Sequence, residues 1–153
     1  MPFLTEKAVT SLDQAAAFEQ VADLGNIHRW DPGVVESDKV TPEPMGVGTT
    51  YALSLRYGAR DVSMLYVVTE YEPNELIVYE GSGGMVKAID TIRFVPHVNG
   101  TEVIYEADLR LTGLARLAQP FMRSKFATIG QSAGDGLRSW LRELERASGS
   151  RPS

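Results

Sequence analysis

Two carboxylates and four tyrosines recur at alternating positions in the strand-rich middle of the sequence, which predicts that they share one face of a sheet. The carboxylates are Glu70 and Asp90, and such groups can move a proton at a bound carbonyl. Tyrosine hydroxyls can orient or polarise the oxygen atoms of the same ligand. Asp90, Glu70 and Tyr105 are therefore the candidates for acid–base catalysis. The tyrosines of this set are Tyr51, Tyr66, Tyr79 and Tyr105.

Hairpin turns assign these side chains to one face. A two-residue turn at 58–59 pairs Leu55 with Val62 and Tyr51 with Tyr66. Opposed residues on neighbouring antiparallel strands point to the same side of the sheet. The two tyrosines are therefore expected to point together toward whatever element covers the sheet.

The next two turns are expected to place both carboxylates on this face. A turn at 73–74 pairs Glu70 with Ile77, and a turn at 83–84 pairs Ile77 with Asp90. Two strand spacings then separate the carboxylates, which is roughly 10 Å. Buried carboxylates are unfavourable unless they are paired or hydrated, so the pattern predicts a cavity that contains water beside them.

The covering element is predicted from the last third of the sequence. Apolar residues recur there at steps of three and four, which is typical of one long amphipathic helix over roughly 116–147. Gly130, Gly134 and Gly136 fall near its middle, and each removes side-chain volume where the helix would cross the sheet. Gly134 is therefore expected to border a ligand pocket, whose usual volume is about 300–1,000 Å³.

Trp30 lies where the chain turns into the strand region. A first helix is expected over 11–24 and a second, short helix over 26–30, which Pro32 ends. Asp31 is expected to accept hydrogen bonds from backbone N–H groups of this turn. Trp30 has two interpretations that the sequence leaves open: the ring packs at the corner, or it lines the entrance of the pocket.

The amino-acid composition excludes some classes of site and argues against some classes of partner. The 153 residues fit one domain, and 43% of them are hydrophobic, which is enough for a core. The sequence has no cysteine and only two histidines, so a thiolate or histidine-rich metal site is excluded and no cofactor is expected. The net charge of −5 argues against nucleic acid or an anionic membrane as a partner.

No segment is expected to cross a membrane or to direct export. No apolar run reaches the ~20 residues that a membrane span needs, and the first residues lack a basic and apolar leader. A cytoplasmic location is therefore expected. Residues 1–147 are expected to form a single ligand-binding domain and 148–153 a disordered tail. The sequence does not indicate the oligomeric state.

Several segments together resemble the START-like, helix-grip superfamily, also called SRPBCC, in its polyketide cyclase/dehydrase and lipid-transport branch. They are the helix pair VADLGNIHRWDPGV, the strand start VGTTY, the strands VVTEYEPNELIVYE and FVPHVNGTEVIYEADL, and the long terminal helix. The resemblance implies an α+β fold in which a curved antiparallel sheet of about seven strands wraps around the C-terminal helix, with two short helices after the first strand. It also implies an apolar cavity for lipids, sterols, hormones or polyketide intermediates, and enzymatic activity in a minority of members.

Two functions follow as hypotheses, with a protein-interaction module as a third. The first is a carrier or sensor that binds a small hydrophobic molecule between sheet and helix. The second is a polyketide cyclase, aromatase or dehydratase that uses cavity tyrosines and a carboxylate as acid and base. The residues expected to bind the ligand are Trp30, Tyr51, Tyr66, Tyr79, Asp90, Tyr105 and Gly134.

Overall fold

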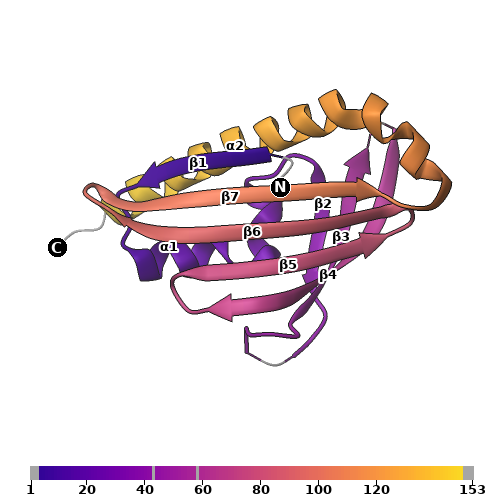
Figure 1. Cartoon of the computed structure of the whole chain (residues 1–153). Coiled ribbons are helices and arrows are strands. Elements are labelled where there is room, and N and C mark those ends of the chain that lie inside the picture. The colour runs from indigo at the N-terminus through magenta and orange to yellow at the C-terminus, as the bar shows by residue number, and fades with distance from the viewer. Residues whose placement is uncertain (1–3, 43, 58, 150–153) are drawn as a thin grey trace.

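A curled antiparallel sheet and one long helix make up most of the molecule (Figure 1). The computed structural model describes residues 4–42, 44–57 and 59–149. Within this part, seven strands pair in the order β1-β7-β6-β5-β4-β3-β2, so the first strand closes against the last. The strands are β1 (Leu4–Thr10), β2 (Val34–Lys39), β3 (Thr50–Tyr57), β4 (Arg60–Glu72), β5 (Leu76–Gly83), β6 (Val86–His97) and β7 (Gly100–Leu111). The helices are α1 (Gln14–Val21), the 3₁₀ helix η1 (Leu24–Arg29), the 3₁₀ helix η2 (Gly113–Ala118) and α2 (Gln119–Gly149).

The α+β helix-grip architecture predicted from the sequence is confirmed. Two short helices follow the first strand, and the long helix α2 packs mainly on β1 at one edge of the sheet (Figure 1). The helix begins three residues later than the predicted 116, because η2 occupies the preceding segment. It ends at Gly149, so 148 and 149 are helical rather than part of a tail, and 150–153 lie outside the described residues.

The first predicted hairpin register is correct. Leu55 is opposite Val62 and Tyr51 is opposite Tyr66, and all but the partly buried Val62 are buried on the concave side of the sheet. Gly58 of the predicted turn lies outside the described residues. The two pairs thus face the core together, as the predicted hairpin turn requires.

The predicted inward position of Glu70 is wrong. A β-bulge between Val68 and Glu70 makes the latter oppose Val78 instead of Ile77, and Glu70 is exposed. Such an extra residue flips the parity of everything that follows it on the strand. Tyr71 therefore takes the inward position and packs edge-on against Phe18 of α1, with 5.6 Å between ring centroids. Glu70 is thereby removed from the candidate site.

The third predicted turn is displaced by one residue, but its consequence for the faces is correct. Gly83 pairs with Val86, so the turn is Gly84–Met85, and Tyr79 rather than Ile77 opposes Asp90. Gly84 adopts a φ of 56°, which a glycine accepts without steric cost. The register is shifted by two residues, which is a full side-chain repeat, so Asp90 still points inward and is buried.

The glycines of α2 allow close contact between the helix and the elements beneath it. A Cβ atom at Gly130 would lie 1.9 Å from Leu4 Cδ2, and one at Gly134 would lie 2.6 Å from Glu6 Cγ. At Gly136 it would lie 1.7 Å from the backbone oxygen of Trp30. The expectation that Gly134 borders a pocket is thereby corrected, because the space beside it is filled by β1.

Candidate functional site

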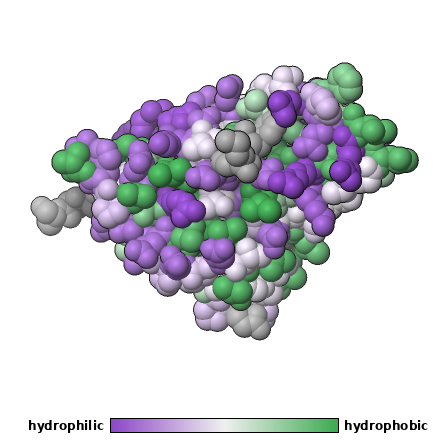
Figure 2. Space-filling view, in the orientation of Figure 1, coloured by the Kyte–Doolittle hydropathy of each residue, from purple (hydrophilic) through white to green (hydrophobic). Residues whose placement is uncertain are grey.

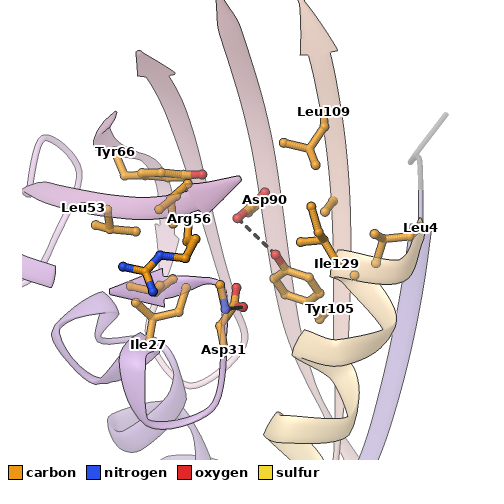
Figure 3. A pocket seen from close by; sticks show the side chains of 15 residues that line it. Leu4, Ile27, Asp31, Leu53, Arg56, Tyr66, Asp90, Tyr105, Leu109 and Ile129 are labelled. Carbon is orange, nitrogen blue, oxygen red and sulfur yellow. Dashed lines mark hydrogen bonds between the residues drawn. The ribbon is translucent and has the colours of Figure 1, made fainter. Parts of the chain in front are cut away.

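A small pocket opens between the concave face of the sheet, the turn after η1 and the first half of α2 (Figure 3). Its apolar wall includes Leu53, Leu109 and Ile129, which come from β3, β7 and α2. The volume is about 50 Å³. One water needs roughly 10–15 Å³ of such space, so the pocket accommodates a few waters. The predicted volume of about 300–1,000 Å³ is therefore wrong for this conformation.

Five polar or charged side chains interrupt the apolar wall: Asp31, Arg56, Tyr66, Asp90 and Tyr105. Three of them were expected from the sequence, and the structure brings Tyr66, Asp90 and Tyr105 onto one pocket (Figure 3). Asp31 was interpreted only as a turn residue. Its neighbour Trp30 is the sequence signal that could have suggested a place in the pocket. A carboxylate that follows a buried tryptophan is itself expected to be shielded from water.

Asp90 and Tyr105 form a hydrogen-bonded pair at the centre of the pocket. Tyr105 donates its hydroxyl to Asp90 Oδ2 over 3.2 Å, and both side chains are buried (Figure 3). Asp90 on β6 is opposite Ala107 on β7, so Tyr105 is its diagonal neighbour. Diagonal neighbours on adjacent strands lie within reach of a long aromatic side chain. The sheet register therefore creates this pair directly.

Burial sets the proton affinity of the two carboxyl groups. Desolvation raises the pKa of Asp90 from 3.8 to about 7; the hydrogen bond from Tyr105 lowers it, and the nearby charge of Asp31 adds to the rise. Desolvation likewise raises the pKa of Asp31 to about 6, against the effect of the N–H group of Gly33, which donates to Oδ1 over 2.9 Å. The pKa of Tyr105 is raised well above its ordinary value by burial and then by Asp90, so this hydroxyl remains a donor.

The ring of Trp30 packs against the ring of Tyr105. The two rings pack edge to face with 5.7 Å between their centroids, and Trp30 is buried. Its Nε1 has no hydrogen-bond partner in the described part of the chain. Of the two interpretations left open by the sequence, this placement agrees with packing at the corner, because Trp30 does not line the pocket.

Tyr51 and Tyr79 use their hydroxyl groups to hold the α1–η1 connection. Tyr51 donates to Asp23 Oδ1 over 3.0 Å, and Tyr79 donates to the backbone oxygen of Ala22. Asp23 in turn accepts from the N–H group of Gly25 at the start of η1. Both rings are fully buried and neither lines the pocket, so they join helix and sheet instead of reaching a ligand.

Tyr66 owes its position to a glycine on the neighbouring strand. Gly81 is its register partner, and a Cβ atom there would lie 2.6 Å from Tyr66 Cε1. The ring therefore lies flat over the glycine and extends toward the pocket (Figure 3). Arg56 lines the outer edge of the same pocket, where its Nε donates to Asp61 Oδ1 over 3.0 Å.

The described residues contain no group of three or more histidines and carboxylates placed to hold a metal ion. Within the same part of the chain, no helix has the length and apolarity to cross a membrane. The polar groups that line the pocket are the hydroxyls of Tyr66 and Tyr105, the carboxyls of Asp31 and Asp90 and the guanidinium of Arg56, which can donate hydrogen bonds, accept them or transfer protons to a bound oxygen or nitrogen atom.

Comparison with solved structures shows the same fold elsewhere. The protein TTHA0849 from Thermus thermophilus is 17% identical, with a TM-score of 0.76 over 96% of this chain and 99% of that chain. The Zhui aromatase/cyclase from Streptomyces sp. R1128 is 12% identical, with a TM-score of 0.75 over 97% and 98%. Ara h 8.0201 is also 12% identical, with a TM-score of 0.66 over 92% and 97%. At these identities the likeness concerns the fold alone.

Comparison with curated proteins gives no match. The family model described as polyketide cyclase/dehydrase and lipid transport matches residues 2–142, which is nearly the whole chain. This match, with the helix-grip fold, confirms the resemblance to the SRPBCC superfamily. The chain therefore belongs to the polyketide cyclase/dehydrase and lipid transport family.

Proposed function

We propose that this protein binds a small hydrophobic molecule that carries a hydroxyl or carbonyl group, as a carrier or sensor located in the cytoplasm. The observation that carries the proposal is the buried Asp90–Tyr105 pair in a wall that is otherwise mostly apolar. Buried polar groups in such a setting orient a ligand and decide which ligands fit. The family description and the shared fold support this class of function.

The pair offers two modes of recognition. Near neutral pH, a carboxyl group with a pKa of about 7 is present in both forms. Protonated Asp90 donates to a ligand carbonyl, and ionised Asp90 accepts from a ligand hydroxyl. Tyr66 and Asp31 border the same space, while Trp30, Tyr51 and Tyr79 hold the walls in place. The apolar part of a polycyclic ligand exceeds about 50 Å³, so its entry requires the walls to separate.

A larger side chain in the pocket wall is expected to weaken ligand binding. Ala107 is buried on the pocket wall, and Ala107→Leu adds three carbon atoms to the space beside Asp90. We expect the affinity for the neutral probe N-phenyl-1-naphthylamine to fall about tenfold or more, which is roughly 1.4 kcal/mol. Titration followed by probe fluorescence measures this change.

Ala88→Leu is the matched control. Ala88 is equally buried on the same face of the sheet but does not line the pocket. Thermal melts of both variants separate loss of binding from loss of folding. Equal probe affinity in folded Ala107→Leu and wild type would contradict binding at this pocket, and so would an equal loss in both variants.

A polyketide cyclase or dehydratase is the second candidate function. It is favoured by the raised pKa of Asp90, because a general acid or base works best when its pKa lies near the working pH. Tyr105 would then hydrogen-bond the substrate oxygen while Asp90 exchanges a proton with the adjacent carbon. Turnover of a poly-β-carbonyl thioester, abolished by Asp90→Asn with binding retained, would support this candidate, and binding without turnover in wild type would exclude it.

A further inference from the structure

The segment between the sheet and the long helix carries large apolar side chains that it does not bury. None of the residues of η2 is buried. Leu114 and Leu117 expose 81% and 79% of their surface. Phe121, in the first turn of α2, exposes 82%. The spacing of three and four residues places the three side chains on one side of the segment. We call Leu114, Leu117 and Phe121 the apolar tip.

The apolar tip stands at one end of the molecule. In Figure 2 hydrophobic residues gather at the right-hand end, where Figure 1 shows η2 and the start of α2. Met85, in the β5–β6 turn, is 55% exposed, and its backbone oxygen accepts from the N–H group of Thr112 just before η2. Apolar side chains that expose about four-fifths of their surface project from the molecule and do not form a flat patch.

Positive charge surrounds the apolar tip although the whole chain is acidic. Between Asp108 and Asp135 the sequence contains no acidic residue, whereas the chain as a whole has 15 basic and 20 acidic residues. In the described part of the chain, ion pairs involve only Arg110 among the basic residues of this stretch, through Asp108 at 3.1 Å. These basic residues are Arg110, Arg116, Arg123 and Lys125.

A shallow groove beside the apolar tip concentrates part of this charge. Lys87 of β6, Arg110 of β7 and Arg116 of η2 line it together, with Gln119 at the start of α2. Gln119 fixes the groove geometry, because its Oε1 accepts from Leu111 N over 3.1 Å and its Nε2 donates to Leu109 O over 3.3 Å. Three cations from three elements thus face a space that an anionic group can enter.

We propose that this end of the protein docks on an anionic lipid bilayer. The apolar tip inserts at the boundary of headgroups and acyl chains, and the surrounding cations contact lipid phosphates. The acidic remainder of the chain is repelled by the same surface, so the charge distribution also fixes the orientation of docking. The inference goes beyond the proposed function, because it concerns a surface outside the pocket.

A bilayer fits this surface better than a protein partner does. Two copies that met tip to tip would bring Arg116, Arg123 and Lys125 of both copies together, and the stretch between Asp108 and Asp135 has no acidic residue to oppose them. Three projecting side chains also bury too little area for a stable protein interface, which needs roughly 1,000 Å² or more. A fluid lipid surface accepts separate projecting side chains without shape complementarity, and each cation near it contributes about 1 kcal/mol, or roughly fivefold in affinity.

Co-sedimentation of the full chain with large unilamellar vesicles tests the proposal. One vesicle set is phosphatidylcholine with about one third phosphatidylglycerol, and the other is pure phosphatidylcholine. We expect binding to the anionic set to be at least about tenfold tighter and to weaken in about 1 M salt. Leu117→Asn with Phe121→Asn, and separately Arg116→Gln with Arg123→Gln, are each expected to lose about tenfold or more of the affinity.

Val95→Asn with Val98→Asn is the matched control. Val95 and Val98 are also exposed, at 41% and 94%, but lie at the other end of the β6–β7 hairpin. This control is expected to bind as wild type does, and circular dichroism checks that every variant is folded. The proposal is overturned if wild type ignores anionic vesicles, or if folded tip variants bind as wild type does. A tip-dependent dimer in sedimentation without vesicle binding would also overturn it, in favour of a second copy.

Discussion

Replacing Gly136 with alanine is expected to lower the free energy of unfolding by about 2 kcal/mol or more. An alanine inside a helix ordinarily stabilises it by about 1 kcal/mol relative to glycine, so the expected sign is the reverse of the usual one. The reason is that the new Cβ atom would lie 1.7 Å from the backbone oxygen of Trp30, which cannot rotate away. Urea denaturation followed by circular dichroism measures the difference.

Gly134→Ala is the matched control for this effect. Its Cβ atom would lie 2.6 Å from Glu6 Cγ and 2.9 Å from Glu6 Cβ, so rotation of the Glu6 side chain together with a small shift of the strand relieves the contact, which no rotation can do at Gly136. The gain in helix propensity then offsets the contact, and the variant is expected to lie within about 1 kcal/mol of wild type. Equal stability of the two variants would contradict the close approach of α2 to the end of η1.

Asp90→Asn is expected to stabilise the protein at pH 8, by on the order of 3 kcal/mol, and to change little near pH 4. The native pKa of Asp90 is about 7, against an ordinary value of 3.8, because burial disfavours the charged form. Between these values the native state holds a proton that the unfolded chain has released. Stability that is fully present below about pH 4 is therefore lost as the pH rises through 7, and asparagine carries no such penalty.

Urea denaturation from pH 4 to pH 8 measures this pH dependence. Asp31 titrates in the same direction with a pKa of about 6, so part of the slope is expected to remain in Asp90→Asn. Asp38→Asn on β2 is the control, because it makes the same chemical change at an exposed carboxylate. A constant difference between Asp90→Asn and wild type across this range would refute the raised pKa.

Side-chain parity explains which predictions from the sequence succeeded. The sheet face of Asp90 was predicted correctly although its partner was not, because a shift of two residues returns every side chain to the same side. Glu70 was misplaced because VVTEYE is compatible with either Glu70 or Tyr71 pointing inward, and only the packing of Tyr71 on Phe18 decides. A bulge of this kind depends on contacts distant in the sequence.

The pocket and the charged end were less predictable, for a different reason. Glycines in a helix remove volume, but whether a neighbouring element fills that volume depends on the helix position; here β1 fills it beside Gly130 and Gly134, and the backbone of Trp30 fills it beside Gly136. Net charge is an average over the chain, so the value of −5 conceals the stretch between Asp108 and Asp135. Asp31 lines the pocket because the turn after η1 folds over the sheet, which the sequence does not indicate.

The glycines of α2 also determine which part of the helix is free to move. Gly130, Gly134 and Gly136 hold its middle so close to β1 and η1 that a rotation or a one-residue slide would drive a side chain into them. The turns before Gly130 contain no such glycine and continue from η2, none of whose residues is buried; the buried Phe126 and the hydrogen bonds of Gln119 to Leu109 and Leu111 hold them instead. If the pocket binds a ligand as we propose, we expect local opening at this end, and not unfolding of the whole domain, to set the rate of ligand exchange.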